Sequence, residues 1–128
     1  MKDPLLEAAL RARDRAYAPY SKFHVGAALE DAEGRIHTGC NVENASYGLT
    51  VCAERIAAFK AVSEGARKFR RIAIAADTSP LTPPCGACRQ VLWELCGDIE
   101  AILVNLRGET ESVQLRDLLP RPFDASIL

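Results

Sequence analysis

Two apolar runs, at residues 70–76 and 101–106, constrain the fold more than any other part of the sequence. The runs RRIAIAA and AILVNL are typical of buried strands, and a segment of helical character at 85–96 separates them. A helix between two strands of one sheet returns the chain to the end where the first strand began, so the two strands should be parallel. The sequence therefore predicts an α/β protein.

The rest of the pattern predicts that the sheet is mixed. Residues 23–30 and 35–42 are expected to form a hairpin around a turn at 31–34, and 111–115 a weak fifth strand. Only RGET separates the fifth strand from the run at 101–106, too short for a crossover helix, so strand five should run antiparallel to strand four.

Further helices are expected to cover this sheet. One should start at the Asp3-Pro4 cap and extend to about Tyr17, and another should cover 51–64 with Thr50 as its cap. A helical turn is expected at 116–119. The 128 residues suit one domain, 1–128, with a three-layer α/β/α architecture and a mixed five-stranded sheet.

Composition argues against two classes of partner. The formal net charge is -1, and the basic run between Arg67 and Arg71 is interpreted as a solvated turn, so we expect no nucleic-acid partner. No apolar run approaches the roughly 20 residues that span a bilayer, so we expect no membrane association. With no targeting segment visible, the chain is predicted to be cytoplasmic, where cysteines stay reduced.

Two predicted helix starts carry cysteines at metal-binding spacing. Residues 50–55 read TVCAER and residues 83–90 read PPCGACRQ. Cys85 and Cys88 lie on one face of a first helical turn and can share a metal ion with Cys52. Three thiolates with an open fourth position are typical of catalytic zinc, whereas a structural site takes four protein ligands. The pattern thus predicts one zinc ion per chain.

Glu54 follows Cys52 by two residues, about 200° around a helix. Since side chains tilt toward the helix N-terminus, both can point at a site in front of it. Three thiolates and Zn²⁺ sum to about -1, which two helix N-termini would offset. Arg55 and Gln90 are predicted to hydrogen-bond the sulfurs and withdraw further charge.

Simpler interpretations of the cysteines stay open at this point. The C-x-x-C pair could be a redox dithiol, or with Cys52 a structural zinc site. Neither explains Glu54, so catalytic zinc is favoured. Cys40 and Cys96 are interpreted as core residues, and His24 and His37 as surface or edge residues rather than ligands.

C-A-E followed by P-C-x-x-C resembles the zinc nucleoside deaminases, which attack C4 of cytosine with a non-ligating glutamate as acid and base. The similarity covers nearly the whole chain. Residues 23–29 look like the family's first strand, 39–48 like its ribose loop and 118–123 like its tail. The all-cysteine ligand set and the short length resemble the homotetrameric cytidine deaminases.

The resemblance implies zinc at Cys52, Cys85 and Cys88, and a proton shuttle at Glu54. By the same resemblance, the nucleoside is bound by Phe23 against the pyrimidine, by Asn41 and Glu43 on the ribose 3′-hydroxyl, by the backbone of Ala53, and by Ala45, Tyr47 and Phe123 from neighbouring subunits. On residue type alone, Phe23 could instead be core, and Asn41 and Glu43 could be turn-forming residues.

The implied activity is hydrolysis of cytidine and deoxycytidine to uridine and deoxyuridine with release of ammonia, in pyrimidine salvage. The implied assembly is a homotetramer with shared active sites. Blasticidin S is the nearest alternative substrate. A nucleic-acid editing enzyme and a non-catalytic zinc module are the competing classes.

Overall fold

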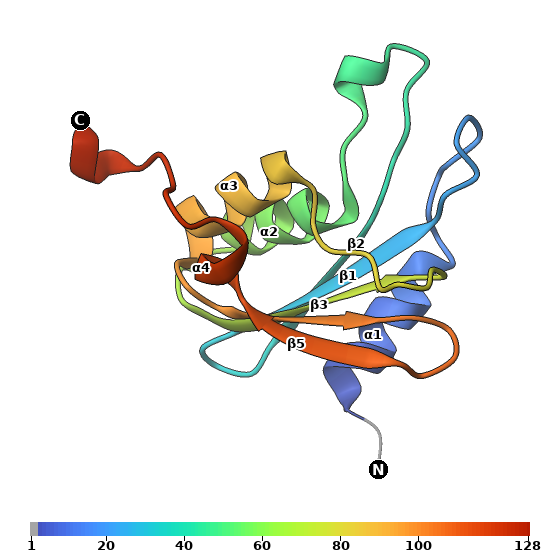
Figure 1. The fold of residues 1–128 in the computed structure, drawn as a ribbon, viewed down its shortest axis with the longest axis horizontal. Helices are drawn as coiled ribbons and strands as arrows, with labels where there is room; N and C mark the ends of the chain where they lie inside the picture. Colours follow the sequence, from blue (N-terminus) through green and yellow to red (C-terminus); the bar gives the residue numbers. More distant parts are fainter. Residues whose placement is uncertain (1–2) are drawn as a thin grey trace.

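A mixed five-stranded sheet forms the centre of the computed structural model, which describes residues 3–128. The strand order is β2-β1-β3-β4-β5 (Figure 1). β3 and β4 are parallel, and the other neighbouring pairs, including β4 and β5, are antiparallel, as predicted. The strands are β1 (Val25–Asp31), β2 (Ile36–Cys40), β3 (Phe69–Ala76), β4 (Glu100–Val104) and β5 (Thr110–Gln114).

Helices cover both faces of this sheet, which gives the predicted three layers (Figure 1). α1 (Pro4–Arg13) packs on one face, and α2 (Ala53–Ser63) and α3 (Gly86–Cys96) pack on the other. α4 (Leu115–Leu118) follows β5 directly. Two short 3₁₀ helices, η1 (Tyr47–Leu49) and η2 (Ala125–Ile127), were not predicted.

Alternation along the strands divides the apolar residues between two cores. In β3, Ile72 and Ile74 pack toward α2 and α3, whereas Ala73 and Ala75 pack toward α1. This is the period of two that an extended chain imposes. Small residues on the α1 side let that helix lie close to the sheet.

Two glycines set the approach of the helices to the β1–β2 hairpin. A Cβ at Gly26 would lie 2.1 Å from the carbonyl oxygen of Ala9 in α1. A Cβ at Gly39 would lie 2.6 Å from the carbonyl oxygen of Ala53 in α2. Since real Cβ atoms do not come so close, only glycine allows the start of α2 to lie this near β2.

Element ends differ from the predictions at two functionally relevant places. α1 ends at Arg13 rather than near Tyr17, so Arg15 belongs to the connection after the helix. α2 begins at Ala53 with Cys52 as its N-cap, so the prediction of Thr50 as the cap is wrong. Thr50 instead accepts a hydrogen bond from the backbone N–H of Asn44.

The basic run after α2 is only partly the solvated turn that was predicted. Arg71 lies in β3 and pairs with Asp3 and Glu30, which ties the N-cap of α1 to the sheet. Within residues 3–128, no helix combines the length and the apolarity that crossing a bilayer requires.

Candidate metal and catalytic site

The N-termini of α2 and α3 bring the three predicted ligands together. Cys52 is the N-cap of α2, Cys85 is the N-cap of α3, and Cys88 lies in the first turn of α3. Their sulfur atoms all lie within 4.8 Å of one another. The Sγ–Sγ distance is 3.7 Å between Cys52 and Cys85 and 3.4 Å between Cys85 and Cys88. Cys52 is 33 residues from Cys85 in the sequence, yet the three cysteines are positioned to hold one metal ion.

Electrostatics at the cluster favour a negative charge on Cys52. A hydrogen bond from the Cys88 thiol, followed by one from Arg55, lowers the pKa of Cys52 to about 5. The Arg55 guanidinium lies 3.5 Å from the Cys52 sulfur, as predicted. The pKa of Cys88 is raised, because its proton is shared with Cys52 and because it is buried. The positive ends of two helices point at the same sulfurs.

Glu54 is a buried carboxyl group with an unused oxygen. The residue is 4 % exposed, and its Oε1 atom has no hydrogen-bond partner in the described part of the chain. Burial raises the pKa of Glu54 to about 7, and the charge of Cys52 adds to the rise. Proteins seldom leave a buried carboxyl group unpaired, so this atom points to a ligand that completes the site.

The donor set fits zinc. Thiolate ligands in a compact group suit this ion, and the three sulfurs leave a fourth position open. Cys85 is exposed while Cys88 is buried, so the cluster faces solvent on one side. Glu54 beside the cluster, without being part of it, is the arrangement that the sequence predicted.

Asn41 organises the start of β1. Its side-chain amide donates to the Phe23 carbonyl at 2.7 Å and accepts from the Val25 N–H at 2.9 Å. The residue is 8 % exposed, so this amide shapes the backbone that carries Phe23. The amide NH₂ group keeps one further N–H for a ligand. Phe23 itself is 42 % exposed and is not part of the core.

Glu43 closes a loop next to the site. One carboxylate oxygen accepts from the N–H groups of Tyr20 and Ser21 at 3.0 and 3.1 Å, and the other accepts from the Ser21 hydroxyl. Glu43 and Tyr47 line a pocket of about 360 Å³ together with Tyr20, Ser21 and Thr50. The Val42–Val51 bridge joins this segment to the chain that leads into Cys52.

Other residues predicted to contact the nucleoside differ in exposure, from the buried Ala53 to the exposed Tyr47. Ala53 is fully buried at the first position of α2, which leaves its backbone as the part that could contact a ligand. Ala45 and Tyr47 belong to the segment between β2 and α2, which extends from the body of the chain (Figure 1). Tyr47 begins η1 and is 75 % exposed. The Tyr47 ring meets Tyr20 edge-on at 6.3 Å.

Gln90 contradicts one prediction. Its amide donates to the Phe123 carbonyl at 2.5 Å and accepts from the Phe123 N–H at 3.3 Å, rather than bonding a sulfur. The C-terminal tail passes over α3 at Gln90, so the nitrogen and the oxygen of the Gln90 side-chain amide both bond to the tail backbone. Trp93, one helical turn further along α3, donates to Asp124 at 3.2 Å. Gln90 therefore fixes the backbone of Phe123, whose side chain stays largely exposed.

Arg89 is a site residue that the sequence reasoning missed. Its Nε donates to the carbonyl of Pro84 at 2.7 Å, and a terminal nitrogen donates to the carbonyl of Leu118 at 3.0 Å. Arg89 thus ties the loop before Cys85 to α4. Its position directly after Cys88 was the available signal, but sequence does not show which carbonyls face it.

The remaining cysteines and histidines lie outside the cluster. Cys96 packs beside the core near α2 and α3, whereas Cys40 lines a surface pocket and is only half-buried. His37 is on the edge strand, as predicted, but it is buried between Asp31 at 3.0 Å and Glu64 at 3.2 Å.

Comparison with known proteins identifies the class of fold and site. The sequence model of the cytidine and deoxycytidylate deaminase zinc-binding region matches residues 2–105. A solved cytidine deaminase from Burkholderia pseudomallei superposes with a TM-score of 0.91 and 50 % identity, covering 96 % of this chain and 100 % of that one.

Proteins related by sequence match this chain over nearly its full length. A cytidine deaminase of Halalkalibacterium halodurans is 53 % identical over 94 % of this chain and 92 % of its own length. One from Mycobacterium tuberculosis is 44 % identical over 90 % of this chain and 84 % of its own length. The chain belongs to the cytidine and deoxycytidylate deaminase family.

Proposed function

We propose that residues 1–128 form a single catalytic domain that hydrolyses the 4-amino group of cytidine and deoxycytidine. The products are uridine or deoxyuridine and ammonia. We further propose that the enzyme acts in pyrimidine salvage in the cytoplasm. The identity of 53 % with a cytidine deaminase over almost the entire chain supports this substrate class.

One observation carries the proposal. The unpaired, buried oxygen of Glu54 lies next to three sulfurs that can hold one metal ion. A structural zinc site has no use for such a carboxyl group, because burying it unpaired is unfavourable. A redox dithiol does not need the third cysteine.

Cys52, Cys85 and Cys88 would hold one zinc ion per chain. When bound, zinc supplies Lewis acidity that lowers the pKa of water in the site. Arg55 and the two helix N-termini keep the thiolate cluster from becoming too negative for that task. Arg89 holds the loop that carries Cys85 in place.

Glu54 would move the protons. A carboxyl group with a pKa near 7 exchanges protons readily at neutral pH. Its carboxylate takes a proton from the attacking water and delivers it to ring N3 of the pyrimidine. It then carries the second water proton to the 4-amino nitrogen, which leaves as ammonia while oxygen remains on C4. Water is thereby divided between the two products.

The nucleoside would be bound by residues around this centre. Phe23 offers an exposed ring at the start of β1, and the remaining N–H of Asn41 and the carboxylate of Glu43 are suited to ribose hydroxyls. We propose a homotetramer in which Ala45, Tyr47 and Phe123 reach the pocket of a neighbouring subunit. The exposure of both rings, 75 % and 60 %, supports this proposal.

The test is the ultraviolet spectrum of each nucleoside during incubation with the purified zinc-loaded protein. We expect cytidine and deoxycytidine to convert to the uracil nucleosides with one ammonia released per turnover. Blasticidin S and a single-stranded oligonucleotide serve as parallel substrates. Deamination of either of these with no reaction of cytidine would contradict the proposal, as would a protein that binds zinc and turns over nothing.

A further inference from the structure

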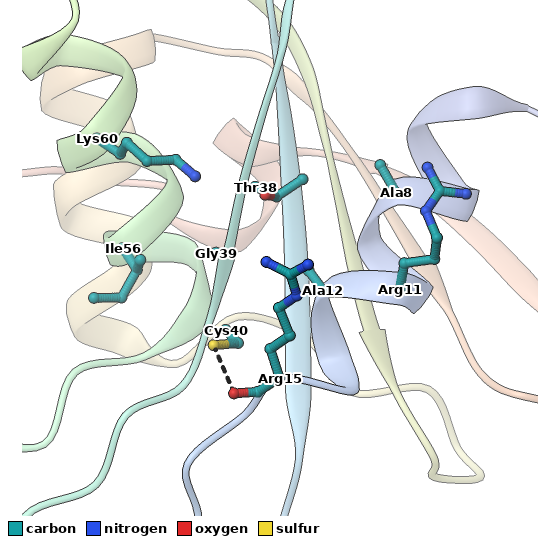
Figure 2. Close-up of a pocket in the computed structure, with 9 residues that line it drawn as sticks. All are labelled: Ala8, Arg11, Ala12, Arg15, Thr38, Gly39, Cys40, Ile56 and Lys60. Atoms are coloured by element: carbon teal, nitrogen blue, oxygen red, sulfur yellow. Dashed lines mark hydrogen bonds between the residues drawn. The ribbon is translucent and has the colours of Figure 1, made fainter.

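A second pocket, whose lining includes none of the three clustered cysteines, is lined by cations. It has a volume of about 370 Å³ and lies between α1, the edge strand β2 and α2. Figure 2 shows Lys60 reaching from α2 and Arg15 reaching from the segment after α1, so that both cationic groups approach Thr38 of β2. Arg11 lies on the outer side of α1 at the rim. None of these residues belongs to the site described above.

The three cations are not neutralised. Among the residues that the structure describes, none of Arg11, Arg15 and Lys60 forms an ion pair with a carboxylate within 4.0 Å. In contrast, Arg71 on β3 is paired twice. Cations gathered at one cavity repel one another, so an anion that enters it is attracted by all of them.

The edge of the sheet adds backbone groups to the same pocket. The N–H of Asn41 donates to Val25 and the carbonyl of Arg35 accepts from Asp31, so these two positions bond to β1. Alternation in an antiparallel pair then directs the N–H and C=O of Thr38 and Cys40 away from β1, toward the open edge. β2 is the outermost strand, so no other strand uses these groups.

The Cys40 thiol lies in the pocket and is influenced by the charges of two of its cations. Its thiol donates to the carbonyl of Arg15 at 3.4 Å. Burial raises the pKa of this thiol, and the charges of Arg15 and Lys60 partly counteract the rise. Both cations therefore face the same sulfur atom, which makes Cys40 a natural probe of pocket occupancy.

We propose that this pocket binds the phosphate or diphosphate group of a small molecule. Arg15 and Lys60 hold the phosphoryl oxygens from opposite sides of β2, and Arg11 attracts the anion at the rim. Phosphoryl oxygens suit this pocket because guanidinium and ammonium groups form their strongest hydrogen bonds with such acceptors. The pocket is bounded by a helix on each side of a five-residue strand, which favours a compact anion over an extended chain. The proposal is independent of the deaminase activity, whose substrate carries no phosphate.

Binding of inorganic pyrophosphate to the zinc-loaded protein, measured by titration calorimetry at low salt, tests this assignment. We expect saturable binding that weakens at least about tenfold when Arg15→Gln and Lys60→Gln are combined, because each hydrogen bond to a charged group contributes about a factor of ten. Lys68→Gln with Arg121→Gln is the matched control, since it removes two exposed cations outside the pocket. The control should bind like the wild type.

Protection of Cys40 locates the bound anion. Pyrophosphate should slow alkylation of Cys40 by iodoacetamide, followed by peptide mass spectrometry, in the wild type and the control but not in the pocket variant. Cytidine, which is uncharged, should not protect Cys40. Absence of pyrophosphate binding, equal binding by the pocket variant, or a Cys40 that is unreactive in the free protein would overturn the proposal. Tighter binding of an oligo-aspartate peptide or of single-stranded DNA would also overturn it in favour of an extended partner.

Discussion

Glu54 is the residue whose surroundings demand the most explanation. It is buried beside three cysteines, and its Oε1 atom is left without a partner in the described residues. A carboxyl group with a buried, unpaired oxygen lowers the stability of the fold, and such a cost is typical of a group kept for function. The mechanism proposed above gives it several proton transfers, so its chemistry should be separable from its contribution to the fold.

Glu54→Gln should keep the fold and the zinc content but lower kcat by about 10²–10⁴-fold, the usual contribution of a general acid and base. Zinc should be measured by metal analysis and kcat by the cytidine assay. Glu111→Gln, an exposed position on β5, is the control and should retain full activity. A Glu54→Gln enzyme within tenfold of the wild-type kcat would contradict the assigned role.

At the scale of elements, close backbone contact positions the helix that carries Cys52 and Glu54. The start of α2 lies against Gly39 of β2, where a Cβ would meet the Ala53 carbonyl and the Ala57 N–H at 2.6 Å each. Both obstacles are backbone atoms, so a larger residue must push the helix away from the strand. The position of Cys52 and the packing of this helix thus depend on residue 39 being glycine.

Gly39→Ala should reduce the free energy of unfolding by about 3 kcal/mol, toward the upper end of overpacking effects. Urea denaturation of the zinc-loaded protein should measure the loss. Gly48→Ala is the control, because a Cβ there meets nothing within 4 Å. Equal stability of the two variants would show that α2 moves without cost and would contradict the close-contact argument.

The contribution of Asp3 to stability can also be tested, because Asp3 both caps α1 and pairs with Arg71. Asp3 accepts the Leu5 N–H at 3.0 Å, and the hydrogen bond from Arg71 is the largest cause of its lowered pKa. Asp3→Ala should cost about 1 kcal/mol. Asp3→Asn should cost less, because asparagine still caps. Chemical denaturation at neutral pH measures both losses.

The charge of Asp3 also adds a pH dependence. Its folded pKa lies below the ordinary value of 3.8, so the stabilisation is present above that value and is lost as pH falls through the folded pKa. Asp3→Asn should therefore lose less stability than the wild type between pH 5 and about 3. Parallel acid dependence of the two proteins would show that the Arg71 pair contributes nothing.

At the scale of the whole molecule, apolar rings remain exposed on segments that extend from the body of the chain. Tyr47 lies in the segment between β2 and α2, and Phe123 lies on the C-terminal tail, which projects at the upper left of Figure 1. Gln90 and Trp93 hold the tail backbone on α3. A fixed tail with an exposed ring is suited to inserting that ring into another subunit.

Light scattering should give a mass about four times the 13.9 kDa of one chain. Shared sites can then be tested with Glu54→Ala, expected to be inactive, and Phe123→Ala, expected to bind cytidine weakly. Co-expressed, the two variants should form mixed pockets that combine Glu54 of one chain with Phe123 of another. Those pockets should regain a normal KM, which neither variant shows alone.

Mixing the two variants after separate purification is the control for this complementation, because assembled oligomers have little opportunity to exchange subunits. Hybrids that show only the weak kinetics of Phe123→Ala would place Phe123 in its own chain's pocket. A monomeric mass would refute the shared site before any kinetics are measured.

The order and type of the main elements, the mixed sheet and the grouping of three cysteines could be predicted from the sequence. These follow from local information: apolar periodicity, the shortness of RGET between β4 and β5, and the spacing of Cys85 and Cys88. The position of Glu54 beside the cysteines could also be predicted, because the direction of a side chain near a helix start depends on the nearby backbone.

Contacts between side chains far apart in the sequence could not be predicted and follow from the tertiary packing. Gln90 bonds the tail rather than a sulfur, Arg89 ties the loop before Cys85 to α4, and His37 is buried between two acids. Arg15 and Lys60 converge on one pocket although they lie on different elements. Long polar side chains reach several partners from one position, so local sequence does not fix the partner. The packing of α1, α2 and α3 on the sheet determines which partners these side chains reach.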